Sequence, residues 1–135
     1  MKTMKNARKN VLIITDDSNE TAEMAAGIAA ALKGNKVSVK PVSDFRGNDI
    51  LPAEAFFLGC EKPNPASFGY IEDLFMHINL AGRPCGVFSP GSKKATQYLA
   101  RILHDSEAAL NPEPLLGSSE TKIGKWCKNV LTKSF

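Results

Sequence analysis

The sequence predicts an α/β protein in which helices cover both faces of a parallel β-sheet. Short apolar runs, such as Val11–Thr15 and Ala55–Gly59, are typical of strands that are buried on both faces. Between these runs lie segments in which apolar residues recur every three or four positions, as expected of amphipathic helices. The connections are long enough for crossovers, so neighbouring strands are expected to run parallel.

The predicted elements alternate along the chain. We expect strands at 11–15, 36–40, 55–59, 85–89 and about 115–116, and helices at about 21–33, 68–82, from 92 to between 104 and 110, and 119–131. Pro41 should limit the pairing of the second strand and place it at an edge of the sheet, because proline has no N–H to donate. The carboxyl ends of the strands then carry three loops, at 16–20, 60–67 and 89–94, where open α/β sheets bind ligands.

Composition is that of a globular protein of one domain, residues 1–135, with residues 1–9 expected to form a flexible basic tail. Hydrophobic residues make up 43% and charged residues 23%, which excludes a disordered or collagen-like chain. The net charge of +3 arises mainly near the two ends, without interleaved aromatic residues, so no nucleic-acid partner is expected. The apolar run at 11–14 is too short for a signal peptide or a membrane span, which predicts a cytoplasmic protein without membrane contact.

Cysteine and histidine give no sign of a metal site or a hydrolytic site. Cys60, Cys85 and Cys127 are odd in number and widely spaced, so we expect buried free thiols. His77 and His104 lie in predicted helices without a triad or a zinc-binding motif around them. No enzymatic activity beyond electron transfer is therefore expected.

Acidic residues occupy the loop after the first strand, where the next helix begins. The free amides and the positive end of a helix normally attract an anion at this position. Here Asp16, Asp17 and Glu20 stand there instead. Asp17 and Glu20 can equally be explained as a pair that resembles a capping box and stabilises the helix without any ligand, with Ser18 or Asn19 as N-cap.

The chain resembles the flavodoxin family along nearly its whole length. The resemblance rests on the order of the elements, the strand end Leu58–Cys60, the strand Arg83–Phe88 and the final helix around Ile123–Trp126. It implies a flavodoxin-like three-layer sandwich with a five-stranded parallel sheet in the order 2-1-3-4-5. It also implies FMN as cofactor, electron transfer as activity and a redox protein as partner, whereas it leaves open whether the chain is a monomer or a dimer.

Flavodoxins hold the FMN phosphate in a Ser/Thr-x-Thr-Gly-Asn-Thr loop and place the flavin ring between two later loops. Of the first loop, Ser18 and Thr21 match the pattern, whereas Asp16 replaces a hydroxyl, Asn19 the glycine and Glu20 the asparagine. The later loops carry no Trp or Tyr for stacking on the flavin. The cofactor-binding residues implied by the resemblance are Asp16, Asp17, Ser18, Asn19, Glu20, Thr21, Cys60, Glu61, Ser89, Pro90, Gly91, Ser92 and Lys93.

Electrostatic repulsion argues against tight FMN binding in this loop. Two like charges a few ångströms apart repel by about 4 kcal/mol at an effective dielectric constant near 20, before screening. Micromolar affinity corresponds to only about 8 kcal/mol. We therefore expect FMN binding to be weak or lost, and the alternative function is that of a binding or interaction module without flavin.

Two lysines follow the third loop and oppose the dipole of the helix that begins there. Lys93 and Lys94 could form an anion pocket with the amides of residues 91–92. Alternatively, they are solvated or neutralise Asp16 and Asp17 across the crevice, which is the interpretation we favour.

Overall fold

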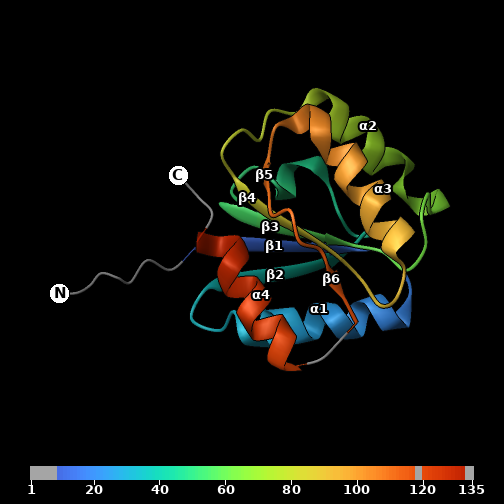
Figure 1. Cartoon of the computed structure of the whole chain (residues 1–135). Helices are drawn as coiled ribbons and strands as arrows, with labels where there is room; N and C mark the ends of the chain where they lie inside the picture. Colours follow the sequence, from blue (N-terminus) through green and yellow to red (C-terminus); the bar gives the residue numbers. More distant parts are fainter. Residues whose placement is uncertain (1–8, 118–119, 133–135) are drawn as a thin grey trace.

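The protein folds into three layers, with the sheet between two pairs of helices (Figure 1). The computed structural model describes residues 9–117 and 120–132. Helices α2 and α3 cover one face of the sheet, and α1 and α4 cover the other (Figure 1). All described strand pairs are parallel, and the order of the first five strands is β2-β1-β3-β4-β5. The predicted α/β class, the strand order and the edge position of the second strand are thus confirmed.

The helices and strands lie close to their predicted positions. The strands are β1 (Asn10–Thr15), β2 (Lys36–Pro41), β3 (Ala55–Gly59), β4 (Pro84–Ser89), β5 (Ala109–Leu110) and β6 (Leu115–Leu116). The helices are α1 (Asn19–Ala31), α2 (Gly69–His77), α3 (Lys93–Leu103) and α4 (Glu120–Thr132). Ser119, where we expected the last helix to begin, lies outside the described residues.

The position of the fifth strand is divided between two short strands, which the sequence did not predict. β5 pairs with the start of β4 at residues 84–85, and β6 pairs with its end at residues 88–89. We expected the third long helix to reach 104–110, but α3 ends at Leu103 and Glu107 adopts a left-handed conformation with φ of 62°. Between β5 and β6, Pro112 and Pro114 have no N–H to offer the neighbouring strand, which interrupts the pairing.

Alternate residues of the central strands build two hydrophobic cores, one on each face of the sheet. Leu12 and Leu58 belong to the core under α2 and α3, whereas Ile13 and Phe57 belong to the core under α1 and α4. The ring of Trp126 on α4 lies 5.3 Å from that of Phe57, measured between centroids.

The three cysteines are buried and free, as the sequence predicted. Burial raises the pKa of the Cys127 thiol to about 12 and raises that of Cys85 well above its ordinary value, because an apolar environment disfavours the thiolate. These two side chains therefore act as small apolar residues in the cores.

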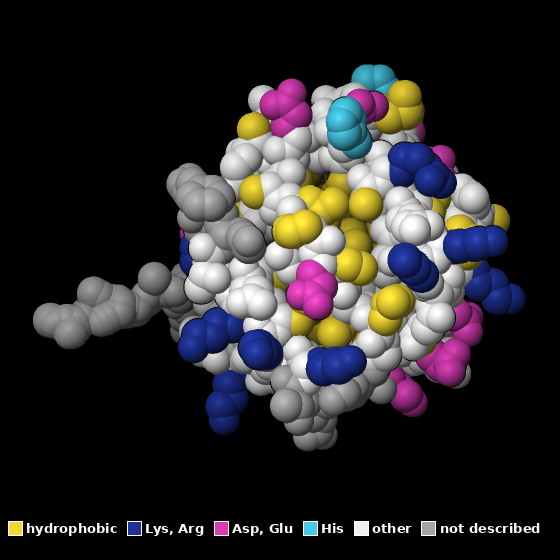
Figure 2. Space-filling model, in the orientation of Figure 1, with side chains coloured by type: hydrophobic (Ala, Val, Ile, Leu, Met, Phe, Trp, Pro, Cys, Tyr) yellow, Lys and Arg dark blue, Asp and Glu magenta, His cyan; other side chains and the backbone are white. Residues whose placement is uncertain are grey.

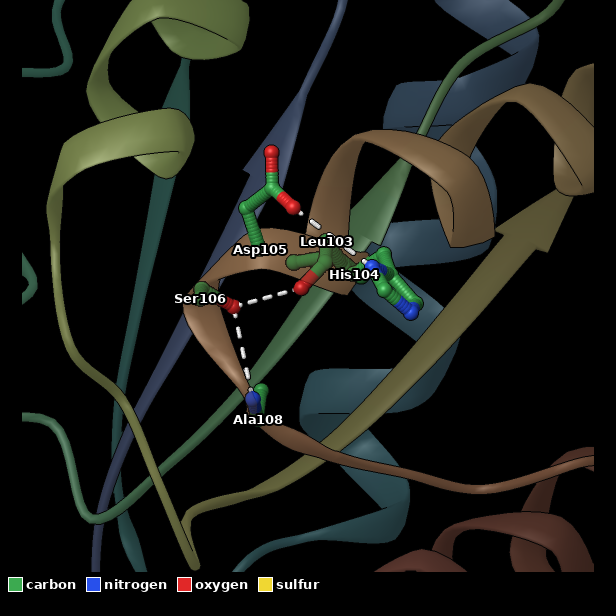
Figure 3. Close-up of polar contacts among 5 residues, drawn as sticks. All are labelled: Leu103, His104, Asp105, Ser106 and Ala108. Atoms are coloured by element: carbon green, nitrogen blue, oxygen red, sulfur yellow. Dashed lines mark hydrogen bonds and ion pairs between the residues drawn. The ribbon is translucent and has the colours of Figure 1, made fainter.

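A hydrogen-bonded corner connects α3 to β5 at the amino ends of the strands (Figure 3). The buried Ser106 hydroxyl donates to the Leu103 carbonyl oxygen at 2.7 Å and accepts from the Ala108 N–H at 3.3 Å. His104 is exposed, with Nδ1 3.5 Å from Asp105 Oδ1. The corner lies at the edge of the sheet opposite the loops that follow the strands. His104 is therefore far from the candidate site.

The first described residue is already attached to the sheet. Lys9 N–H donates to Asn35 Oδ1 at 3.0 Å, and Lys36 N–H donates to the Lys9 carbonyl oxygen at 2.9 Å. The other residues of the expected tail, 1–8, lie outside the described part of the chain. Among the helices that the structure describes, none has the length and apolar character needed to cross a membrane.

The end of β3 is close-packed against β4, and this contact gives a stability test. Gly59 pairs with Phe88, and a Cβ atom added at Gly59 would overlap the Phe88 ring. We expect Gly59→Ala to lower the free energy of unfolding by about 1–3 kcal/mol, because the packed core cannot yield space without strain. Urea denaturation followed by circular dichroism measures this change.

Gly69 provides the matched control, because a Cβ there meets no atom within 4 Å and its φ of −54° suits any residue. Gly69→Ala should leave stability unchanged or raise it slightly. Equal stability of the two variants would contradict the packing argument.

Candidate functional site

The loops after β1 and β3 meet at the carboxyl edge of the sheet, as the sequence predicted. Asp16 N–H donates to the Gly59 carbonyl oxygen at 3.2 Å. The Asp16 side chain reaches further, because its Oδ2 accepts from the Glu61 N–H at 2.8 Å. The second loop is attached to the end of β4, from which the third loop leaves, since Cys60 N–H donates to the Phe88 carbonyl oxygen at 3.3 Å. The three predicted loops therefore form one continuous rim.

The carboxylate of Asp16 is the centre of this rim. The residue is only 7% exposed. Its Oδ1 accepts from the Ser18 N–H at 3.2 Å and from the Ser18 hydroxyl at 3.0 Å. With the Glu61 N–H on Oδ2, three donors surround one carboxylate. An arrangement of backbone N–H and hydroxyl donors of this kind is how proteins hold a bound anion. Here the anion is the protein's own side chain.

Of the two predicted N-cap residues of α1, Ser18 and Asn19, the structure has Ser18 in this position. Its Oγ accepts from the Thr21 N–H at 3.2 Å and lies 2.7 Å from the Thr21 hydroxyl oxygen. Asp17 is exposed and does not form the proposed capping pair with Glu20. Asn19, the first residue of α1, is also exposed. The hydroxyl groups expected to hold a phosphate are thus already bonded to each other and to Asp16.

Glu20 and Glu61 bring two carboxyl groups together at the carboxyl edge of the sheet. The hydrogen bond between the Glu20 and Glu61 side chains and the negative charge of Glu61 raise the pKa of Glu20 above its ordinary value. Partial desolvation and the charge of Glu23 contribute further in the same direction. Since Glu61 also donates its N–H to Asp16, the acidic groups of the first and second loops form one cluster. A dianionic ligand would meet repulsion from several sides.

The third loop is held by its own serine side chains. Buried Ser89 accepts through Oγ from the Ser92 N–H at 3.2 Å, and Ser92 caps α3 by accepting from the Ala95 N–H at 3.0 Å. Pro90 is half-buried and Gly91 exposed. The amide and hydroxyl of Ser92 are therefore occupied within the loop.

The two lysines at the start of α3 do not form ion pairs with the acids of the first loop. Lys93 and Lys94 are exposed, and within the described ranges no contact of 4.0 Å or less joins either of them to Asp16 or Asp17. The proposed direct neutralisation across the crevice is thus absent, and solvation is the better description. Lys93 instead lines a separate cavity beside α3.

No pattern in the sequence pointed to a buried tyrosine beneath the second loop. Tyr98 on α3 donates its hydroxyl to Glu72 Oε2 on α2 at 2.5 Å, although the two residues are 26 positions apart. Desolvation and the bond to Glu72 raise the pKa of Tyr98, so the phenol stays protonated. Phe68 lies wholly in the core, as its helical spacing suggested. Neither ring is available to stack on a flavin.

Cys60, which follows β3, is a protonated thiol. Burial raises its pKa to about 12, with a smaller contribution from the charge of Asp16. Its Sγ donates to the Lys62 carbonyl oxygen at 3.2 Å. A thiol in this state is a poor nucleophile. Within the described residues no group of three His, Cys, Asp or Glu side chains is arranged to hold a metal ion.

The hydrogen bonds of Asp16 predict that even a conservative substitution of this residue lowers the stability of the fold. Asp16→Asn keeps the shape of the side chain but turns an NH₂ group toward an N–H donor. We expect the free energy of unfolding to fall by about 1–3 kcal/mol, because a buried donor loses a charged acceptor. Asp17→Asn, which alters an exposed neighbour, should change it by less than about 0.5 kcal/mol. Urea denaturation at pH 7 compares the two, and equal effects would contradict the role of Asp16.

The raised pKa of Glu20 predicts a pH-dependent gain on removing its charge. A carboxyl whose pKa is higher in the folded state favours folding when protonated, and this contribution is lost as the pH rises through its pKa. Glu20→Gln should therefore raise Tm at pH 7 and leave it nearly unchanged at pH 3. Glu23→Gln, which removes a weaker source of repulsion, should give a smaller shift at pH 7. A Tm gain equal at both pH values would contradict this account.

Comparison with solved structures shows which known fold this arrangement matches. A Streptococcus pneumoniae TIGR4 flavodoxin superposes with a TM-score of 0.79 at 17% identity, over 92% of this chain and 99% of that chain. A short-chain flavodoxin associated with a non-canonical PDU bacterial microcompartment gives 0.82 at 11% identity, over 94% and 99%. A Fusobacterium nucleatum flavodoxin mutant bound to flavin mononucleotide gives 0.76 at 13% identity, over 95% and 98%.

No protein-family model and no curated protein matches the sequence. At these identities the structural likeness establishes the fold and not the ligand. The order of strands, the two helix layers and the coverage of nearly the whole chain nevertheless agree. The chain therefore has the flavodoxin fold.

Proposed function

We propose that this chain is a flavodoxin-like module that does not retain FMN through its first loop and works as a binding or interaction module. The observation that carries the proposal is the Asp16 carboxylate, which takes the donors that a phosphate would need. Both of its oxygens accept hydrogen bonds from the chain itself, from Ser18 on one side and Glu61 on the other.

The donor set left for a phosphate is a poor fit. Ser18 and Thr21 bond to each other, and the Thr21 N–H is used by the cap. The amides of Asn19 and Glu20 at the start of α1 would have to hold the phosphate beside the Asp16 carboxylate. Repulsion of about 4 kcal/mol per like-charged pair near 4 Å, before screening, removes much of the gain from two N–H donors.

The flavin ring also lacks a stacking partner in these loops. The segments 16–21, 60–67 and 89–94 contain no Phe, Tyr or Trp. Phe68, which follows the second loop, is fully buried. An aromatic pair contributes about 0.5–1.5 kcal/mol beyond its buried area, and this contribution is missing.

An acidic rim suits a different class of partner. Asp17, Glu20 and Glu61 lie in the first and second loops, with Asp17 and Glu20 exposed and Glu61 half-buried. Charge complementarity favours a protein surface rich in lysine and arginine, and such attraction chiefly raises the rate of association. Binding of this kind should weaken as salt is added.

The second candidate is the FMN-dependent electron carrier. It is favoured by the likeness to flavodoxins, of which one is described as bound to flavin mononucleotide. In that case the predicted residues Ser18 to Thr21 would hold the phosphate, residues 60–67 and 89–93 would surround the ring, and a redox protein would be the partner.

A spectroscopic test separates the two candidates. We expect the purified protein, incubated with FMN and desalted, to show no flavin absorbance. Calorimetry should give a Kd above about 100 μM for FMN and no preference for FMN over riboflavin, because the phosphate adds repulsion. Retained flavin bands, or FMN binding much tighter than riboflavin binding, would overturn the proposal.

A double variant shows whether the acids are the cause. Asp16→Ser with Glu20→Asn restores the side-chain types of the flavodoxin pattern, and we expect FMN affinity to rise at least about tenfold without a matching rise for riboflavin. Asp17→Asn, at the variable position of the pattern, is the control and should give a smaller gain.

A further inference from the structure

A cavity of about 250 Å³ opens between α3 and the divided fifth strand. Its apolar wall includes Val87 on β4, Ala100 on α3, Leu110 at the end of β5, and Pro112 on the segment between β5 and β6. Figure 2 shows hydrophobic side chains at the bottom of a hollow between α3 and this segment, in the orientation of Figure 1. The cavity lies beside α3, apart from the acidic rim of the first two loops.

The cavity results from the interruption of the fifth strand. β5 and β6 pair with β4 only at residues 84–85 and 88–89, so the stretch around Val87 has no strand partner on this side. The bulged segment is held in place, because the Glu113 carbonyl oxygen accepts from Trp126 Nε1 at 2.7 Å and from Asn111 Nδ2 at 3.1 Å. The opening is therefore fixed by hydrogen bonds to α4 and within the loop.

A buried amide faces this cavity with an unused acceptor. Asn111 is only 5% exposed and lines the cavity. Its Nδ2 donates to Glu113, whereas its Oδ1 accepts no hydrogen bond from the part of the chain that the structure describes. That oxygen is not among fully buried atoms without a partner, so it keeps some accessible surface. A nearly buried acceptor of this kind is normally satisfied by a donor.

A positive charge stands at the same cavity. Lys93 lines it, and no carboxylate in residues 9–117 or 120–132 lies within 4.0 Å of its ammonium group. Thr96, also on the wall, is satisfied because its hydroxyl donates to the Lys93 carbonyl oxygen at 2.8 Å. Lys93 and Asn111 thus offer a cation and an acceptor beside an apolar surface.

We propose that this cavity binds a small aromatic carboxylic acid that carries a ring N–H or O–H. The ring would lie against Val87, Ala100 and Pro112, the carboxylate would pair with Lys93, and the ring donor would bond to Asn111. Pockets for drug-sized ligands span about 300–1,000 Å³, so a cavity of this size suits a ligand of about a dozen non-hydrogen atoms. This site lies apart from the acidic rim, and Lys93 is the one residue that it shares with the loops that the resemblance assigns to the flavin.

Titration with indole-3-acetate tests the proposal, because this molecule combines the three features. Two-dimensional NMR of the full chain should show saturable shifts at the amides of Val87, Ala100 and Leu110, with a Kd between about 0.1 and 1 mM. Indole-3-ethanol, which lacks the carboxylate, should bind at least about fivefold more weakly. Absence of saturable shifts up to about 10 mM, or shifts centred on residues 16–21, would overturn the proposal.

Matched variants test whether Lys93 supplies the positive charge and whether the ligand occupies the cavity. Lys93→Gln should weaken binding of indole-3-acetate about fivefold and leave indole-3-ethanol unaffected. Lys94→Gln, in the same turn of α3 but not on the cavity wall, should change neither. Ala100→Phe fills the cavity and should abolish binding of both compounds. Equal losses in the two lysine variants would show general charge attraction and contradict the site.

Discussion

A buried carboxylate has to be compensated by hydrogen bonds, and Asp16 obtains them from two loops at once. Ser18 supplies an N–H and a hydroxyl from the first loop, and Glu61 supplies an N–H from the second. This interaction fixes the start of α1, joins the ends of β1 and β3, and places the other acids around the same opening. The proposed function rests on it, because donors that serve an internal anion are not free for an external one.

The flavodoxin fold is kept although the chemistry of its first loop is changed. The sheet and its helices rest on two apolar cores, which lie on the two faces of the sheet and away from the acidic side chains. Loops at the carboxyl edge can therefore change in charge without loss of the scaffold, which is why fold and function separate in this architecture. Asp16 and Glu20 stand where the flavodoxin pattern has a hydroxyl and an amide, and Ser18 caps α1 beside them.

At the edge of the sheet formed by β5 and β6, the interruption of a strand creates a cavity. Pro112 and Pro114 remove two donors from the position of the fifth strand, and the chain bulges between β5 and β6. Contacts of Glu113 with Trp126 and Asn111 hold the bulge open. The resulting cavity combines an apolar wall with Lys93, a residue that the family resemblance assigned to the flavin crevice.

Local patterns of residues were enough to predict most of the helices and strands, whereas the order of the strands in the sheet was an expectation from the family resemblance. Apolar runs such as Ala55–Gly59 and helical spacing suffice for this, because the side-chain periods of strand and helix are set by the local backbone. The same patterns located the three loops and the acidic character of the first. Three features became visible only in the folded chain: Asp16 bonds to Glu61, 45 positions away, Glu20 meets Glu61, and the fifth strand is divided. These features depend on which distant backbone groups come within hydrogen-bonding distance, and no local pattern of residues records that.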